Sequence, residues 1–300
     1  MDNESFKPLK FLKNYLYKVI HFLMLLKPGI LLGNSLTFLS GFLIASKNQF
    51  ELKYFLISLI SLISIIGSAC IINNIFDRDI DRQMNRTKNR FLCNSNIFMI
   101  FLSYLYSFFL LFLGFFLCYQ YNNLFCLILF ILGFFIYTVI YTIFLKRKKI
   151  YATLIGGISG SLPPLIGYVT IQKKFDICSI ILFLVYFFWQ IPHTFSISIY
   201  CLEDYQNIKI PTYFIKKGIL KSQIIIISSI FLNFLFLLLL SVYISVNFLN
   251  YFILCFFYFF WIFFSIFGRF FLSDKKWSYY IFIFSLFVIF LKNIFFLNFL

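Results

Sequence analysis

The sequence predicts an all-α, polytopic membrane protein, and three observations carry this prediction. The 300 residues are 62% hydrophobic and only 12% charged, whereas a soluble domain is about 25% charged. Apolar runs of the length that crosses a bilayer, roughly 20 residues, recur along the chain. The net charge of +16 falls in short clusters between these runs, which is how membrane topology is encoded. This arrangement favours the lipid bilayer as partner and excludes nucleic acid.

The apolar runs mark nine expected transmembrane helices, separated by short polar stretches. A tandem Pro163–Pro164 interrupts the fifth run and must break its backbone hydrogen-bond ladder. Gly156 and Gly160 in the same run have the spacing of close helix packing. The expected spans are 28–46, 53–74, 97–118, 123–145, 151–171, 177–200, 219–246, 248–272 and 276–297.

The distribution of Lys and Arg over the loops predicts the orientation. With nine spans, 21 of the 26 Lys and Arg residues fall on the side of the N-terminal segment and the even-numbered loops. By the positive-inside rule this side is cytoplasmic and the C-terminus lies outside. We therefore expect a cytoplasmic segment at 1–27, one membrane-embedded domain at 28–297, and a location in the cell's inner (plasma) membrane.

The second apolar run leads into an unusual charged stretch, "NNIFDRDIDRQMNRTKNR". On a helix that continues through this stretch, Asn73 and Asp81 lie within about 40° of Asp77, and Asn74 within about 60°. Asp79 falls on the opposite side, where we expect it to pair with an arginine. One helix face thus offers two carboxylates and two carboxamides.

Oxygen ligands of this kind suit Mg²⁺, which takes one or two carboxylates together with waters and substrate phosphates. The alternative is that Asp77 and Asp81 pair with nearby arginines in a solvated loop. That alternative leaves Asn73 and Asn74 unexplained, because polar residues at membrane depth are costly and usually functional.

Two further groups of polar residues accompany this face. Lys146 and Arg147 end the fourth run, either as topology anchors or as ligands of a diphosphate. Gln190 and His193 lie within about 40° of Asp204 on one helix, so a polar stripe descends from a second acidic motif into the membrane. His193 either hydrogen-bonds a neighbouring helix or contacts a substrate through its neutral imidazole.

The charged stretch at 73–90 resembles the first aspartate-rich motif of the intramembrane UbiA-type prenyltransferases, and its Asn-Asn form resembles the branch that farnesylates heme. Three other segments resemble the same branch in the same order, over residues 27 to 217. They are "KPGILLGN" at 27–34, "LKRKKIYATLIGGISGSLPPLIGY" at 145–168 and "WQIPHTFSISIYCLEDYQNIKIP" at 189–211.

The resemblance implies nine helices around a central cavity that opens to the cytoplasm. It implies that farnesyl diphosphate, heme b and water give heme O and diphosphate with Mg²⁺ as cofactor, and it suggests a heme-copper oxidase as the downstream user. The implied site residues are the metal ligands Asn73, Asp77, Asp81 and Asp204, the catalytic residues Asp77, Asp81, Lys146 and Arg147, and the substrate-binding residues Asn73, Asn74, Arg90, Lys146, Arg147, Gln190, His193 and Asp204.

Some positions depart from the family pattern, and other functions compete. Phe91 stands where the family usually has Pro, Ala152 where many members have Asn, and Lys209–Thr212 replaces Gly-Ile-Pro-Met. The rival functions are prenyl transfer to an aromatic quinone precursor, a cation-coupled transporter and a noncatalytic membrane subunit. A transporter predicts acids near the bilayer midplane in broken helices, whereas these acids cluster at helix ends.

Overall fold

The computed structural model describes residues 19–47, 49–244 and 248–297. All regular secondary structure in these ranges is helical, and nine segments of them are long and apolar enough to cross a membrane. This confirms the predicted fold class. The expected N-terminal segment 1–27 lies outside the described residues up to position 18.

The helix boundaries follow the apolar runs closely, although two of the nine segments are divided. The helices are α2 (Pro28–Ser46), α3 (Leu52–Phe76), α4 (Arg78–Gln83), the 3₁₀-helix η1 (Phe91–Asn94), α5 (Ile97–Tyr121), α6 (Leu124–Phe135), the π-helix η2 (Ile136–Leu145), α7 (Ala152–Gly160), α8 (Leu162–Gln172), α9 (Ile177–Tyr200), α10 (Leu202–Asn207), α11 (Tyr213–Lys217), α12 (Ile219–Tyr243), α13 (Phe248–Phe271) and α14 (Asp274–Leu297).

Local chemistry explains several of these ends. Asp176 and Ser179 form a capping box that opens α9, and the Asn96 side chain accepts from a free N–H at the start of α5. The prolines at 163 and 164 follow the break between α7 and α8, because proline suits the first turn of a helix but not its interior. The predicted interruption of the fifth span is confirmed.

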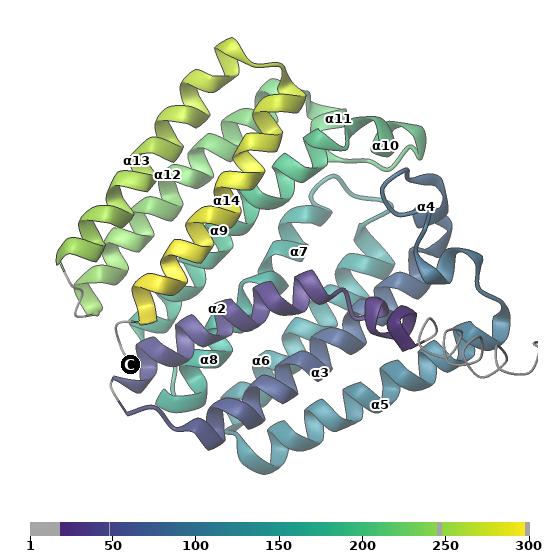
Figure 1. Ribbon diagram of the computed structural model, residues 1–300, viewed down its shortest axis with the longest axis horizontal. Coiled ribbons are helices and arrows are strands. Elements are labelled where there is room, and N and C mark those ends of the chain that lie inside the picture. The colour runs from purple at the N-terminus through teal and green to yellow at the C-terminus, as the bar shows by residue number, and fades with distance from the viewer. Residues whose placement is uncertain (1–18, 48, 245–247, 298–300) are drawn as a thin grey trace, which may run out of the picture.

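The long helices form one bundle in which α2 packs on α8, α3 on α5, and α9 on both α12 and α14 (Figure 1). The α2–α8 contact is a close backbone approach. A Cβ atom on Gly41 would collide with the Pro164 carbonyl oxygen, and one on Gly167 with the Phe38 carbonyl oxygen. Glycine therefore lets these two helices meet without intervening side chains.

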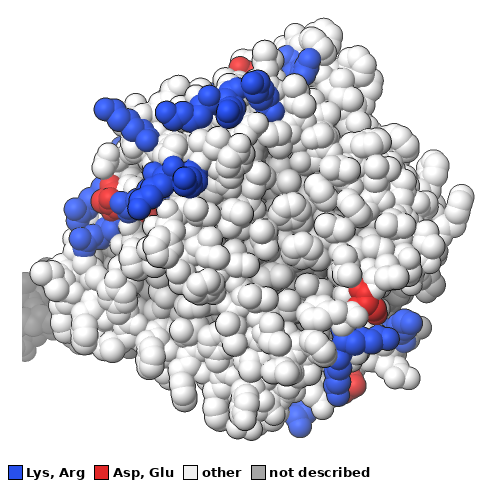
Figure 2. Space-filling view, turned by 180° about the vertical axis from the view of Figure 1, so that it is seen from behind, with Lys and Arg blue, Asp and Glu red and all other residues white. Residues whose placement is uncertain are grey.

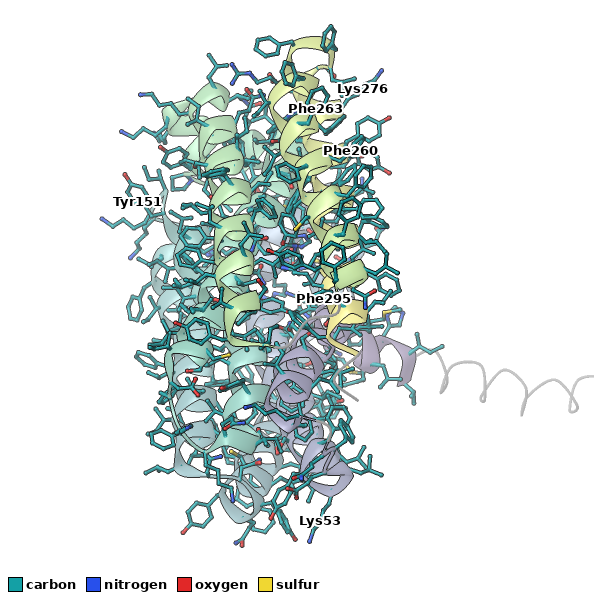
Figure 3. The ribbon with its side chains drawn as sticks, turned by 90° about the vertical axis from the view of Figure 1, so that its left-hand side faces the viewer. Lys53, Tyr151, Phe260, Phe263, Lys276 and Phe295 are labelled. Carbon is teal, nitrogen blue, oxygen red and sulfur yellow. The ribbon has the colours of Figure 1, made fainter. Side chains whose placement is uncertain are left out.

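The outer surface has the charge pattern of a membrane protein. Figure 2 shows Lys and Arg at two opposite ends of the molecule, with a broad uncharged belt between them. Lys53 and Lys276 lie at opposite ends of the bundle in Figure 3, on the two sides to which the loop charges assign them. The protein is a multi-pass membrane protein.

Candidate active site

A cavity of about 1050 Å³ runs into the bundle. Charged and amide side chains surround one end of it, including Asp81, Arg90 and Lys146, whereas Leu62, Ile166 and other apolar residues line its interior. We call the charged end the mouth. A polar mouth on an apolar interior fits a ligand with a charged head and a hydrocarbon body.

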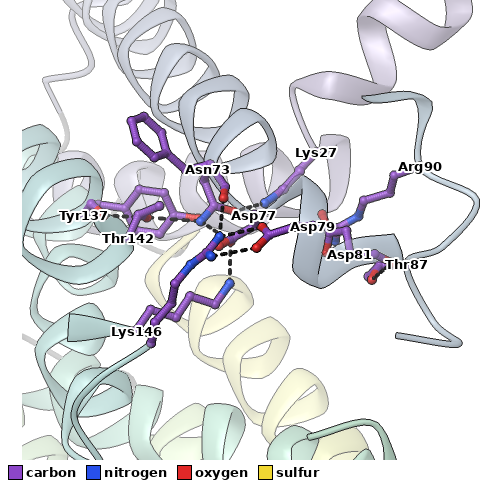
Figure 4. A network of polar contacts seen from close by, with 12 residues as sticks. Lys27, Asn73, Asp77, Asp79, Asp81, Thr87, Arg90, Tyr137, Thr142 and Lys146 are labelled. Atoms are coloured by element: carbon purple, nitrogen blue, oxygen red, sulfur yellow. Dashed lines mark hydrogen bonds and ion pairs between the residues drawn. The ribbon is translucent and has the colours of Figure 1, made fainter. Parts of the chain in front are cut away.

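Asp77 lies at the centre of a buried polar network at the mouth (Figure 4). It follows α3 and precedes α4, and the residue is 1% exposed. Its Oδ2 accepts from Asn73 Nδ2 at 2.7 Å and from the Lys146 ammonium. Asn73 in turn accepts from Lys27 and donates to the Thr142 hydroxyl at 3.1 Å.

Two buried oxygens of this network have no hydrogen-bond partner among the residues that the structure describes. They are Oδ1 of Asp77 and Oδ1 of Asn74. Asn74 is held in place because its Nδ2 donates to the Leu25 carbonyl at 2.9 Å. A buried oxygen without a donor is costly, and carboxylate and carboxamide oxygens are the donor atoms that Mg²⁺ prefers. The residues at the mouth therefore fit a bound divalent cation.

Asp79 points to the opposite side, as the helical periodicity predicted. Backbone bonds from Asp77 to Asn73 (2.9 Å) and from Asp81 to Asp77 (2.8 Å) continue the helical register across the α3–α4 junction. Asp79 forms a bidentate pair with Arg147 at 2.6 and 2.7 Å, and the Arg147 hydrogen bonds hold the pKa of this carboxyl below its usual value. Both side chains are substantially exposed, at 60% and 40%.

The remaining acids of the predicted metal set have their own partners. Asp81 is 4% exposed and pairs with Arg90 at 2.7 Å. Asp204 is also buried and accepts from the Asn85 backbone N–H at 3.2 Å, which ties the second acidic motif to the first. Nowhere in the described ranges do three His, Cys, Asp or Glu side chains form a metal-binding group.

The π-helix η2 positions Lys146, and the sequence pattern gave no sign of this π-helix. Its wider turns continue to Lys146, whose N–H bonds the Tyr141 carbonyl five residues earlier at 2.8 Å. Lys146 lines the cavity, with its ammonium 5.9 Å from the centre of the Tyr141 ring. Burial alone would lower the pKa of Lys146, but Tyr141 and the Asp77 carboxylate raise it above its usual value. Lys146 is therefore a permanent cation at the mouth.

Lys27 is a second, partly buried cation at the mouth, and it is not among the site residues that the sequence predicted. It precedes Pro28 with a φ of 53°, in the left-handed region that a lysine seldom adopts. Its ammonium bonds Asn73, and burial lowers its pKa to about 8. Strained backbone often accompanies function. The only available signal was its place in the quoted segment at 27–34.

The polar stripe on α9 reaches the cavity. Gln190 and His193 both line it, and Gln190 donates to the Gly160 carbonyl at 3.1 Å. His193 stacks on Trp189 with 4.8 Å between ring centroids, and its Nδ1 lies 2.9 Å from Ser285 Oγ on α14. Asp77, Arg147 and Asp204, by contrast, do not line the cavity, and Asp77 lies behind Asn73 and Lys146, which do.

The hydrogen bond between His193 and Ser285 defines the tautomer of the imidazole. Ser285 has a single hydroxyl proton and donates it to the Phe282 carbonyl at 2.6 Å. Its oxygen must then accept from His193, so Nδ1 carries the proton. In the neutral ring the other nitrogen, Nε2, keeps a free lone pair.

Comparisons with known proteins identify the family of this chain. The family model of the UbiA prenyltransferase family matches residues 34–291. The protoheme IX farnesyltransferase of Buchnera aphidicola subsp. Cinara cedri is 44% identical over 271 residues, which are 89% of this chain and 96% of that protein. The corresponding enzyme of Baumannia cicadellinicola is 39% identical over 278 residues, 89% and 93% of the two chains.

Solved structures share the fold. A digeranylgeranylglyceryl phosphate synthase superposes with a TM-score of 0.73 at 19% identity, covering 94% of this chain and 98% of the other. A UbiA homologue from Archaeoglobus fulgidus, bound to GPP and Mg²⁺, superposes with a TM-score of 0.63 at 15% identity, covering 91% and 98%.

Proposed function

Because the chain belongs to the UbiA prenyltransferase family, we propose that it transfers the farnesyl group of farnesyl diphosphate to a vinyl group of heme b. The observation that carries this proposal is a buried, charged mouth on a long apolar cavity. The relatives named protoheme IX farnesyltransferase support the choice of acceptor. Residues 28–297 form the catalytic domain in this proposal.

Farnesyl diphosphate, heme b and water are the reactants, and heme O and diphosphate are the products. The allylic C–O bond of farnesyl diphosphate breaks, and diphosphate leaves with the bonding electrons. The vinyl π bond of heme b then forms the new C–C bond. Water adds to the resulting cation beside the porphyrin and loses a proton, which gives the hydroxyl group of heme O. Apolar cavity walls keep other water away from the first cation.

The mouth residues stabilise the departing diphosphate. Lys146 and Lys27 supply two partly buried ammonium groups at the cavity, and fixed positive charge lowers the barrier where negative charge develops. Oδ1 of Asp77 and Oδ1 of Asn74, which lack hydrogen-bond donors among the described residues, would hold the cation, and Asn73, Asp81 and Asp204 would supply further oxygen ligands. Bound Mg²⁺ would neutralise diphosphate oxygens during departure. Arg90 completes the charge around the mouth as the partner of Asp81.

His193 orients the acceptor in this proposal. Its Nε2 lone pair is available at the cavity, since Ser285 holds the proton on Nδ1, and neutral imidazole is the form that ligates heme iron. Gln190 lies on the same helix face, where it contributes to the acceptor site.

Ser285→Ala should weaken heme binding about 10- to 100-fold, because partners that orient a ligating histidine contribute about that much to metal affinity. The measurement is a heme titration followed by the Soret band. Ser278→Ala is the matched control, since Ser278 is equally buried on α14 and bonds only the Lys275 carbonyl. An unchanged titration for Ser285→Ala would contradict the role of this serine.

We place the protein in the inner membrane with the mouth on the cytoplasmic side and the C-terminus outside. The excess of Lys and Arg on the mouth side of the bundle supports this orientation. Heme O made here would then serve a heme-copper oxidase.

The proposed activity is tested by giving the purified protein farnesyl diphosphate with heme b or with 4-hydroxybenzoate and identifying the products by mass. We expect product from heme b only. EDTA should abolish its formation and added Mg²⁺ should restore it. Product from 4-hydroxybenzoate alone would reassign the acceptor, and an undiminished rate in EDTA would contradict the metal site.

A further inference from the structure

A fully buried lysine, Lys292, lies in the membrane-spanning part of α14. It is 0% exposed, and its Nζ has no hydrogen-bond partner among the residues that the structure describes. The salt bridges within the described ranges all involve other residues. A lysine at membrane depth is costly and usually marks a functional site. The described part of the protein therefore presents a cationic group with no anion of its own.

Aromatic rings and polar side chains surround Lys292, and we call this group the Lys292 cluster. Its Nζ lies 4.7 Å from the centre of the Tyr186 ring and 5.7 Å from that of Trp189. Tyr186 is also 0% exposed, and its hydroxyl lies close to Ser40. The next residue, Asn293, is 6% exposed and accepts from the Ser40 hydroxyl. Among the described residues, a buried ammonium without a hydrogen-bond partner thus lies beside other polar side chains, which indicates a missing polar ligand.

The Lys292 cluster adjoins the cavity at the end away from the mouth. Asn293, Ile289 and Trp189 line the cavity, whereas Lys292 and Tyr186 lie beside these lining residues. Lys292 follows Ser285 by seven residues, so it lies on the same face of α14 and about 10 Å farther along the helix. The other end of α14 is on the mouth side, because Lys275 pairs with Glu203 in the second acidic motif at 3.3 Å.

The distance between Lys292 and His193 is also no larger than the width of a porphyrin. The Trp189 ring centroid lies 4.8 Å from that of His193 and 5.7 Å from Lys292 Nζ, so the last two are at most 10.5 Å apart. The four-carbon stem of lysine lets its ammonium turn from the aromatic rings towards Asn293. A ligand centred beside His193 therefore reaches Lys292 with a peripheral group.

The chemistry of the reactants identifies this peripheral group. The diphosphate of the donor is held at the mouth, and its farnesyl chain carries no charge. Heme b bears two propionates, which are ionised at neutral pH like ordinary carboxyl groups. We propose that Lys292 binds a propionate carboxylate of the acceptor. This inference rests on the proposed function and makes Lys292 a residue that determines how the porphyrin is oriented.

The proposed contact gives the porphyrin a direction in the cavity. Protoheme carries its vinyl groups on the pyrroles opposite those that carry the propionates. A propionate at Lys292 therefore turns the vinyl edge towards the mouth, where the allylic cation is generated. The same contact favours heme b over neutral porphyrins of similar size.

The test compares heme b with its dimethyl ester, which keeps the ring and iron but has no carboxylate. Wild-type protein should bind heme b about 10- to 100-fold more tightly than the diester, as expected for a hydrogen bond to a charged group. In Lys292→Met this preference should fall to nearly one, and Lys292→Arg should retain most of it. Affinities are measured by Soret titration and folding by thermal unfolding.

Two outcomes would overturn the inference about Lys292, and a separate measurement tests the proposed function. Equal affinity of wild-type protein for the two hemes would overturn the inference even if every variant failed to fold. A preference that survives in folded Lys292→Met would overturn it as well. Conversion of heme b to heme O by the wild-type protein is measured separately. Its absence would reject the proposed function, whereas the binding comparison would still test whether Lys292 binds a propionate.

Discussion

Asp77→Asn should lower the rate of farnesyl transfer by more than about 100-fold. Losing a residue that only orients a metal ligand costs about 10- to 100-fold, and losing a ligand itself should cost more. The substitution keeps the size of the side chain but removes the negative charge that faces Lys146 and the proposed cation. The measurement is kcat with saturating farnesyl diphosphate and heme b across a Mg²⁺ titration.

Asp79→Asn is the matched control, two residues away in the same motif. Asp79 is 60% exposed and pairs with Arg147 outside the cavity, and exposed ion pairs contribute about 1 kcal/mol or less to stability. This variant should retain most of its activity. Equal losses in the two variants would contradict the assignment of Asp77 and Asp79 to opposite sides, provided that both unfold at the wild-type temperature.

Lys146→Met should lower kcat about 10²- to 10³-fold, the effect of removing one preorganised group that stabilises developing negative charge. Lys146 lines the cavity and is only 21% exposed at its side chain. Because its methylene stem is largely retained in methionine, the variant tests the charge rather than the packing. The measurement is single-turnover farnesyl transfer, which reports the chemical step.

Arg147→Met separates two basic residues that are neighbours in sequence. The Arg147 guanidinium reaches Asp79 and the Phe76 carbonyl instead of the cavity. We expect the rate of this variant to remain within a few-fold of wild type. If Arg147→Met lost as much activity as Lys146→Met, the diphosphate would have to extend beyond the cavity described above.

The sequence was sufficient for the architecture because apolar length and loop charge are strong signals in membrane proteins. The nine expected spans agree with the observed ones to within a few residues at most ends. Helical periodicity also placed Asp79 opposite Asp77, since the register continues through the α3–α4 junction. The division of the fourth span was missed, because a π-helix leaves an apolar run unchanged.

The site was less predictable where residues distant in sequence meet. Lys27 bonds Asn73 across 46 positions, and no spacing argument relates the two. Ser285 and Lys292 lie in an aromatic-rich span, where a serine or lysine by itself gives no indication of its neighbours. Lys146 and Arg147 could not be distinguished, because the last turn of a helix can direct consecutive residues to opposite sides.

The central claim is that the acceptor alkene receives first the farnesyl group and then water. The most direct test is to run the reaction with heme b in H₂¹⁸O and determine the product mass. The proposed function predicts heme b enlarged by one farnesyl group and one hydroxyl group, with one ¹⁸O atom incorporated. A farnesylated product without ¹⁸O would contradict the addition of water, and recovery of unmodified heme b beside free farnesol would contradict transfer to heme.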